Sequence, residues 1–350
     1  MDRRSTSLQH FAKGTVIPAT PLVLDAERQF DPEGQKLLTG YYLEAGAGGI
    51  ATAVHSTQFE IRDPRFGLFE SVIATVADAI DAYEARTGRT VVRISGACGR
   101  TEQAVREAET AKRLGYDAVL LSPGGLDGED EDYLVDRTRA VAEVLPVIGF
   151  YLQRAVGGRR LSYDYWLRVC NTPGVIGIKV AAFDRYATVD VMRAAAFCDR
   201  ADEVALYTGN DDNIISDLTA TFSFAGEDGT LRTRRFVGGL LGHWSVWTHT
   251  VAELFERLRA DPNDPTWRTL AAQVTDANGA IFDVANGFRG CISGIHEVLH
   301  RQGLMQNTWC LCDHERLSSG QREEIDRVCR MYPHLTDDAF VRDYLQKNRR

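Results

Sequence analysis

Eight short apolar runs recur along the first 250 residues of this chain, and they constrain the fold more than any other feature. They occupy residues 16–20, 49–54, 90–95, 118–121, 146–151, 174–179, 204–207 and 236–241. Short runs rich in β-branched residues predict buried strands. Helical patterns lie between them, for example at 102–114, where Ala104, Ala108 and Ala111 share one face and Gly115 follows as a stop signal. Eight such strand–helix units predict an α/β fold, a (β/α)8 TIM barrel over residues 1–250.

The last hundred residues continue with helical patterns, for example at 251–259 and 283–301. No low-complexity linker or charge block separates them from the preceding units. Residues 251–350 are therefore predicted to be C-terminal helices packed on the barrel, within a single structural unit. Between the last two predicted strands, the polar segment 223–233 is predicted to be a solvated loop.

Composition limits the partners and the compartment of the protein. The chain has 350 residues, a formal net charge of −9 and a pI near 5.5, with no long basic run. This balance argues against nucleic acid and against anionic membranes as partners. No apolar stretch is long enough to span a bilayer, and the N-terminus lacks an apolar signal core. Seven cysteines, an odd number in a large chain, indicate reduced thiols, so a cytoplasmic protein is predicted.

Lys179 ends the sixth apolar run and is the strongest candidate for chemistry. An ammonium group at the inner end of a buried strand is costly unless it is paired or loses its proton. A lysine with a lowered pKa is a nucleophile that forms an imine with a ketone. The alternative is a lysine whose amine reaches solvent at the strand end. Tyr151, at the end of the preceding run, favours the chemical interpretation.

In a barrel of this type the carboxyl ends of all strands meet at one face, where catalysis takes place. The residues expected there besides Lys179 and Tyr151 come from the ends of three other runs: His55, Ser56, Thr57 and Glu60 from the second, Thr208, Gly209, Asn210 and Asp211 from the seventh, and Gly239, Gly242 and His243 from the eighth. An amine, a phenol, hydroxyl groups and exposed backbone amides suit a ketone that also carries a carboxylate.

These motifs resemble the dihydrodipicolinate synthase / N-acetylneuraminate lyase superfamily of Schiff-base aldolases and dehydratases. The resemblance runs from about residue 14 to residue 335. Its most specific part is the pair Tyr151 and Lys179, which has the family's spacing of 28, with the tripeptide Gly177-Ile178-Lys179. The supporting segments, in the family's order, are 14–21, 46–60, 96–101, 209–212, 238–242, 287–304 and 316–318.

The resemblance implies a role for each matched residue. Lys179 would form the imine and Tyr151 would relay protons. Ser56, Thr57 and the backbone at Gly209 and Gly239 would hold the substrate carboxylate. It implies no cofactor, because the lysine itself activates the ketone, and it implies a homo-oligomer, a dimer or a tetramer.

The chain also departs from the family pattern. Gln58 and Phe59 stand where the family has glycine and glutamate, and Gly124-Gly125 stand near the place of an aromatic relay residue. Val156 takes the position of the arginine with which the synthases bind an aldehyde carboxylate. Dihydrodipicolinate synthesis is therefore disfavoured, and a 2-oxo acid aldolase or a 2-keto-3-deoxy sugar acid dehydratase is predicted instead.

Two other classes of protein stay open. One is a barrel without catalysis that binds or senses a small molecule. The other is an aldolase that depends on a metal rather than on Lys179. The segment Cys310 to His314 supplies only half of a zinc motif, and no metal is predicted. His55, Glu60 and His243 have structural interpretations that are at least as good as a role in the site.

Overall fold

The computed structural model describes residues 2–348. The chain divides into two compact units. Unit 1 consists of Met1–Thr15 and Val92–Leu240, and unit 2 of Val16–Val91 and Leu241–Arg350. The helices after residue 250 thus belong to the same unit as residues 16–91. The predicted domain boundary at residue 250 does not coincide with this division and stays a prediction.

All eight predicted strands are present, and they belong to one sheet. They are β1 (Val16–Pro18), β2 (Gly49–Thr52), β3 (Val92–Ala97), β4 (Ala118–Leu121), β5 (Val147–Leu152), β6 (Val175–Ala181), β7 (Ala205–Thr208) and β10 (Gly238–Leu241). Their order is β1-β10-β7-β6-β5-β4-β3-β2, and a parallel bridge joins Ala19 to Ala51. This sequential order is that of the predicted (β/α)8 barrel.

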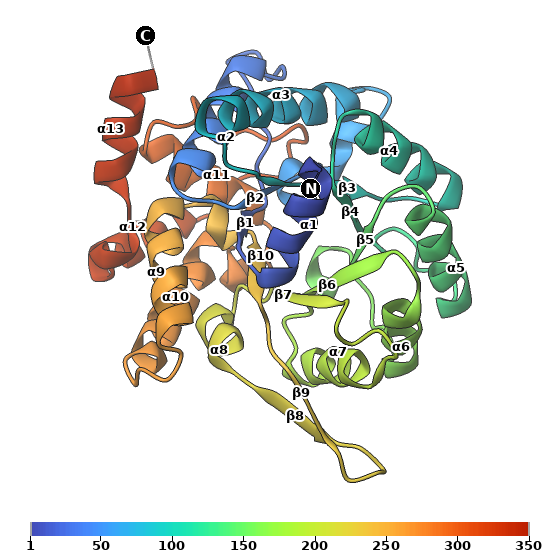
Figure 1. The fold of residues 1–350 in the computed structure, drawn as a ribbon. Helices are drawn as coiled ribbons and strands as arrows, with labels where there is room; N and C mark the ends of the chain where they lie inside the picture. The colour runs from blue at the N-terminus through green and yellow to red at the C-terminus, as the bar shows by residue number, and fades with distance from the viewer. Residues whose placement is uncertain (1, 349–350) are drawn as a thin grey trace. The chain divides into compact units, whose positions relative to one another are not determined.

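Unit 1 alternates its strands with helices. They are α1 (Arg3–Lys13), α4 (Thr101–Arg113), α5 (Glu131–Ala142), the 3-10 turn η3 (Arg154–Val156), α6 (Tyr163–Asn171), α7 (Arg185–Phe197) and α8 (Ile214–Thr219). The side chains of Asp130, Ser162 and Asp184 accept backbone N–H groups at the starts of α5, α6 and α7. Figure 1 shows α4 to α7 on the outer side of strands β4 to β7.

Helix α1 begins unit 1 and was not among the helices predicted from the sequence. The Phe11 ring stacks on Tyr207 with centroids 4.5 Å apart, and the Tyr207 hydroxyl donates to the Phe11 carbonyl oxygen at 2.7 Å. Gly177 makes this close packing possible, because a Cβ there would lie 2.7 Å from the Ala205 oxygen and 3.0 Å from the Phe11 ring. Aromatic packing of α1 against β6 and β7 therefore closes the sheet of unit 1 where Phe11 and Tyr207 meet.

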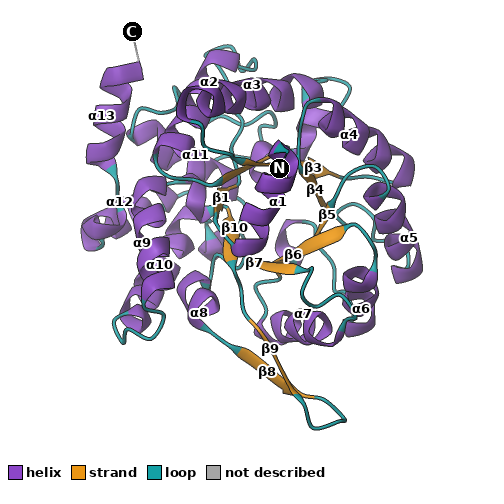
Figure 2. Cartoon of the chain, viewed as in Figure 1, coloured by secondary structure: helices purple, strands orange, loops and turns teal. Residues whose placement is uncertain are grey.

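The segment predicted as a solvated loop at 223–233 contains an antiparallel hairpin instead. Strands β8 (Phe222–Ala225) and β9 (Leu231–Arg234) pair with each other, and Figure 2 shows them extending beyond α7. Phe222 and Phe224 alternate with exposed residues, a pattern of period two that is too short to stand out in the sequence. Arg232 lies over the Phe197 ring of α7 at 4.9 Å.

Unit 2 carries the first two strands, the turns after them and the C-terminal helices. Its other elements are α2 (Pro32–Glu44), η1 (His55–Thr57), η2 (Phe59–Arg62), α3 (Phe69–Thr87), η4 (His243–Ser245), α9 (Thr248–Ala260), α10 (Trp267–Ile281), η5 (Val284–Asn286), α11 (Cys291–Arg301), α12 (Gln321–Met331), η6 (Pro333–Leu335) and α13 (Asp338–Asn348). A buried phenol connects three of them, because the Tyr41 hydroxyl donates to Asp337 Oδ2 at 2.6 Å and accepts the Thr248 N–H at 2.9 Å.

The helix predicted at 283–301 begins only at Cys291. Asp283, Gly287 and Phe288 have φ angles of 57°, 66° and 67°, which an α-helix does not accommodate. The apolar residues of this segment had suggested one continuous helix. Among residues 2–348, no helix has both the length and the apolar character needed to cross a membrane.

Candidate active site

Lys179 lies inside strand β6, two residues before its end, with 7% of its surface exposed. It is paired in register with Phe150 of β5 and with Tyr207 of β7. Paired residues of neighbouring parallel strands point to the same face of a sheet. The Lys179 Nζ accordingly lies over the Phe150 ring, 4.6 Å from its centroid. This burial argues against the alternative in which the amine reaches solvent at a strand end.

Burial lowers the pKa of Lys179 to about 8, and the negative charge of Asp211 opposes that shift. Within residues 2–348 the amine has no hydrogen bond or ion pair at contact distance, and the Phe150 ring is its nearest recorded partner. An aromatic face stabilises an ammonium group only weakly. About a tenth of the molecules therefore carry a neutral, nucleophilic amine at pH 7.

Gly209 provides the room in which the lysine side chain lies. A Cβ at this position would be 2.6 Å from Lys179 Cε and 2.8 Å from Ala181 Cβ. Its N–H donates to the Val180 carbonyl oxygen at 2.7 Å, so this amide is already used by the sheet. The structure thus brings Gly209 to Lys179, but as space for the side chain. Gly239 lies on β10 in register with Thr208, and its N–H makes a long contact of 3.4 Å with the Thr15 oxygen.

A buried carboxylate fixes the turn that carries Asp211. Asp217 Oδ2 accepts the Thr208 hydroxyl at 2.7 Å and the Asn210 side-chain amide at 2.9 Å, while Oδ1 accepts Arg185 at 2.6 Å. A fully satisfied buried network of this kind is rigid. It therefore holds Asp211 close enough for its charge to act on Lys179. The sequence had placed Asp211 at the catalytic face without assigning it a role.

Tyr151 is buried but is not brought to Lys179. Its partner in register is Val180, and its ring stacks on Trp166 of α6 with centroids 5.3 Å apart. Its hydroxyl accepts the Leu161 N–H at 3.4 Å, and burial raises its pKa above the ordinary value. Since successive residues of a strand point to opposite faces, the phenol lies on the helix side and Phe150 on the lysine side.

Ser56 and Thr57 lie in unit 2, in the short turn η1 after β2. The Ser56 hydroxyl donates to the Ala19 oxygen at 2.6 Å, and the Thr57 hydroxyl donates to the Thr20 oxygen at 2.7 Å. Thr57 Oγ1 also accepts the Val54 N–H at 3.3 Å. A hydroxyl has one proton to donate, so in this arrangement both groups can only accept further hydrogen bonds. Their role in carboxylate binding stays a prediction.

The three residues of open role also lie in unit 2. His55 and Glu60 are half-buried, and the His55 ring is 6.0 Å from that of Phe59. His243 is buried against Trp247, and burial lowers its pKa to about 4, so it is neutral near pH 7.

The cysteine segment predicted to be half of a zinc motif is also in unit 2. Cys310 lies 3.8 Å from Ser293 Oγ and 3.9 Å from His296 Nδ1, and burial raises the pKa of its thiol to about 12. Burial therefore favours the protonated form of this thiol. Within residues 2–348, no three His, Cys, Asp or Glu side chains are grouped as a metal site requires.

Comparison with known proteins finds curated relatives of low identity and solved structures with a similar fold. No family model matches the chain. An N-acetylneuraminate lyase of Mediterraneibacter gnavus is 23% identical over 219 residues, 62% of this chain and 65% of that protein. A 4-hydroxy-tetrahydrodipicolinate synthase of Marinobacter nauticus is 26% identical over 71% of this chain and 76% of its own. The structure of a dihydrodipicolinate synthase from Acinetobacter baumannii, complexed with pyruvate, has a TM-score of 0.72 at 19% identity and covers 91% of this chain and 98% of its own.

These relatives and this structure support the resemblance to the dihydrodipicolinate synthase / N-acetylneuraminate lyase superfamily that the motifs carry. The fold of the chain is the predicted (β/α)8 barrel with C-terminal helices. The matched segment covers slightly less than two thirds of the N-acetylneuraminate lyase, so a particular activity is not carried over with the superfamily.

A strand irregularity explains why the superfamily's spacing does not bring Tyr151 to Lys179. At the start of the pair Val147 lies opposite Val175, an offset of 28 residues, but Ile148 already lies opposite Gly177. One extra residue of β6 is accommodated there, as in a β-bulge. Every later pair is offset by 29, which places Phe150 opposite Lys179. Spacing in the sequence could not reveal this shift of one residue.

This register predicts that the hydroxyl of Tyr151 contributes little to chemistry at Lys179. We expect Tyr151→Phe to leave the rate of imine formation at Lys179 within about threefold of the native rate, because a single long hydrogen bond is lost. Phe150→Ala removes the ring beside the amine and serves as the comparison. The rate can be followed by borohydride trapping. If Tyr151→Phe lowered the rate of imine formation by about a hundredfold, the phenol of Tyr151 would be the proton relay after all.

Proposed function

We propose that this protein is a lyase that binds a 2-oxo acid as an imine on Lys179 and makes or breaks a bond beyond C3. The observation that carries the proposal is the buried amine with a pKa of about 8 that has no hydrogen bond or ion pair at contact distance within residues 2–348. A charged lysine inside a strand without such a partner destabilises the folded protein. Imine formation is a function that requires such an amine, because the lowered pKa makes it nucleophilic. The resemblance to the dihydrodipicolinate synthase / N-acetylneuraminate lyase superfamily supports this assignment.

The chemistry begins with the neutral amine. The Lys179 nitrogen pair attacks C2 of the oxo acid, the carbonyl π pair moves to oxygen, and a proton passes from nitrogen to that oxygen. A second proton then reaches the hydroxyl, which leaves as water while the nitrogen pair forms the C=N bond. The resulting iminium accepts the electron pair released when a bond beyond C3 breaks, or when a proton leaves C3. Cleavage, condensation and loss of water share this intermediate.

Asp211 is the group we assign to proton movement at this amine. It is buried, it follows β7, and it is the ionisable residue whose charge acts on Lys179. Its carboxylate can accept the proton that the amine loses and return it to the departing hydroxyl. Phe150, beside the amine, has no proton to exchange. In this chain a carboxylate thus takes the role that the resemblance had assigned to Tyr151.

The substrate is proposed at the level of a 2-oxo acid, with pyruvate as the smallest and a 2-keto-3-deoxy sugar acid as the extended case. Val156, at the position where the synthases have a carboxylate-binding arginine, keeps dihydrodipicolinate synthesis disfavoured. Assembly into a dimer or a tetramer stays a prediction from the resemblance.

Reductive trapping tests the proposal directly. The protein is incubated with pyruvate or a longer 2-oxo acid, reduced with borohydride and analysed by peptide mass spectrometry, with an adduct expected on Lys179. Its rate of formation should rise roughly tenfold per pH unit below pH 8 and level off above it, because only the neutral amine attacks. Asp211→Asn removes the charge that raises the Lys179 pKa, so the plateau should begin at a lower pH. An adduct spread over exposed lysines, or none with any acid, would refute the proposal.

A binding module without catalysis is the second candidate, and two observations favour it. Phe150 supplies no proton beside Lys179, and the Ser56 and Thr57 hydroxyl protons are used by backbone oxygens. Such a protein would bind an oxo acid without turning it over. Calorimetric binding of a 2-oxo acid by Lys179→Met, equal to that by the native protein, would favour this candidate over the lyase.

A further inference from the structure

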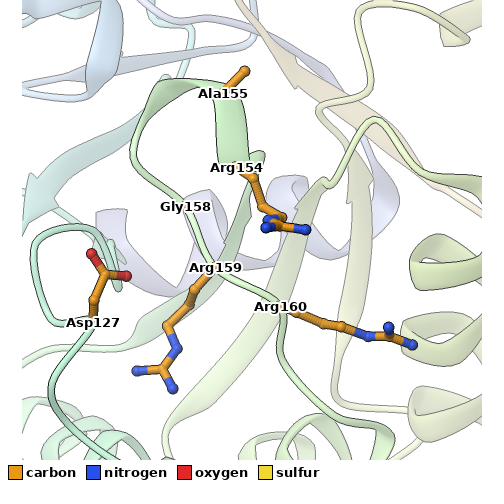
Figure 3. A pocket seen from close by; sticks show the side chains of 6 residues that line it. All are labelled: Asp127, Arg154, Ala155, Gly158, Arg159 and Arg160. Atoms are coloured by element: carbon orange, nitrogen blue, oxygen red, sulfur yellow. The ribbon is translucent and has the colours of Figure 1, made fainter.

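The loop that follows β5 gathers three arginines around one open pocket in unit 1. The pocket has a volume of about 790 Å³ and is lined by Asp127, Arg154, Ala155, Gly158, Arg159 and Arg160. It lies at the carboxyl end of β5, the same strand that places Phe150 beside Lys179. In Figure 3, Arg154 and Arg160 extend to one side of the loop, and Arg159 extends to the other.

Backbone geometry shows that this loop is built to bring the arginines together. The Gly158 N–H donates to the Gln153 oxygen at 2.9 Å, which closes the segment between them into a ring. Gly157 has a φ of 92°, and a Cβ at Gly158 would lie 1.8 Å from the Leu152 oxygen. The clash excludes any side chain at position 158, and the left-handed conformation at position 157 favours glycine. The closure places Arg154 near Arg159 and Arg160.

One of the three arginines is fixed and two are available. The Arg159 guanidinium donates to the Leu126 oxygen at 3.0 Å and to the Glu129 oxygen at 2.5 Å, which ties the β5 loop to the loop of Asp127. Neither Arg154 nor Arg160 has a recorded hydrogen bond or ion pair with any residue from 2 to 348, and both are exposed. Their donors are free for a ligand.

The charge of the pocket matches a dianion. Three arginines and one aspartate give 3 − 1 = +2. A phosphate monoester carries about −1.5 to −2 at pH 7 and offers three acceptor oxygens. Guanidinium groups bind such oxygens in pairs, with a geometry that lysine does not provide.

We propose that this pocket binds a terminal phosphate on the 2-oxo acid substrate, at the end remote from the imine. The proposal rests on the function proposed above, with Lys179 holding C2 and the arginines holding the far end. From Phe150 to Arg154 the chain advances four residues, at most about 14 Å. A phosphorylated sugar-acid chain and the long arginine side chains cover this distance together.

The test compares a 2-keto-3-deoxy aldonic acid that carries a terminal phosphate with the same acid without it. The concentration that gives half-maximal trapping at Lys179 should be about tenfold lower for the phosphorylated acid. The double variant Arg154→Gln/Arg160→Gln should abolish this preference, and Asp127→Asn should increase it. Arg106→Gln, an exposed arginine of α4, is the matched control and should leave it unchanged. Pyruvate, which has no far end, should be trapped equally by the native protein and by all three variants.

Equal trapping of the two acids by the native protein, or a preference that survives in the double variant, would overturn the proposal. Competition by inorganic phosphate without any preference for the phosphorylated acid would also overturn it, because the pocket would then bind a free anion. If no acid is trapped, pyruvate included, the proposed function has failed. Calorimetric titration with the phosphorylated acid then tests the pocket by itself, and equal affinity of the native protein and the double variant would reject it.

Discussion

Replacing Lys179 with methionine is expected to abolish adduct formation and to lower turnover by at least about a thousandfold, the largest effect predicted for this protein. The substitution keeps the length and the packing of the side chain and removes the only atom that can form the imine. When a nucleophile is lost, the remaining groups supply little of the rate. The measurement is mass spectrometry after borohydride reduction, together with a turnover assay on the best-trapped acid.

The chain offers a clean control for this experiment. The other lysines, Lys13, Lys36, Lys112 and Lys347, are all exposed. Lys112→Met removes an amine of ordinary environment from α4 and should change neither the adduct nor turnover. Turnover that persists in Lys179→Met would show chemistry that does not pass through this amine and would return the metal-dependent aldolase to consideration.

The fold of this protein could be predicted from its sequence because each strand leaves a local signal. A run such as 118–121 is apolar throughout and coincides with β4, since a strand covered on both faces needs no alternation. The helix at 102–114 likewise follows from one apolar face and a glycine stop. The short hairpin β8–β9 and the interrupted helix before Cys291 were missed, because their conformations depend on single turns rather than on a repeating pattern.

The site was harder to predict, because it depends on register. Lys179 was found correctly as a buried lysine, since its cost is visible in the sequence alone. The aromatic residue beside Lys179 was not predicted correctly. One extra residue in β6 shifts the register, so that Phe150 lies opposite Lys179, where the spacing had placed Tyr151. Gly209 was expected to offer an amide and instead offers space, which only the position of Lys179 Cε reveals. Asp211 was expected at the catalytic face, but its electrostatic effect on Lys179 could not be predicted, because it depends on tertiary distance.

Replacing Lys179 with methionine is also expected to stabilise the folded protein. The size of this stabilisation depends on pH. The folded protein lowers the pKa of Lys179 from 10.5 to about 8, a shift worth about 3 kcal/mol of unfolding free energy. Loss of the contact with the Phe150 ring offsets about 1 kcal/mol of it. Lys179→Met should therefore raise the free energy of unfolding by about 2 kcal/mol at pH 7. A residue that stabilised the barrel by its charge would give the opposite sign.

The pH dependence follows from proton binding. Below pH 8 both the folded and the unfolded lysine are charged, so the native protein bears the full penalty and the variant has its full advantage. Between pH 8 and 10.5 the unfolded chain binds the extra proton, so the native protein gains stability relative to the variant as pH rises. Urea unfolding should show an advantage of about 2 kcal/mol for Lys179→Met at pH 7 that is almost gone at pH 9.5, while Lys112→Met matches the native protein at both pH values. An advantage that does not change with pH would mean that packing, and not the buried charge, distinguishes the two proteins.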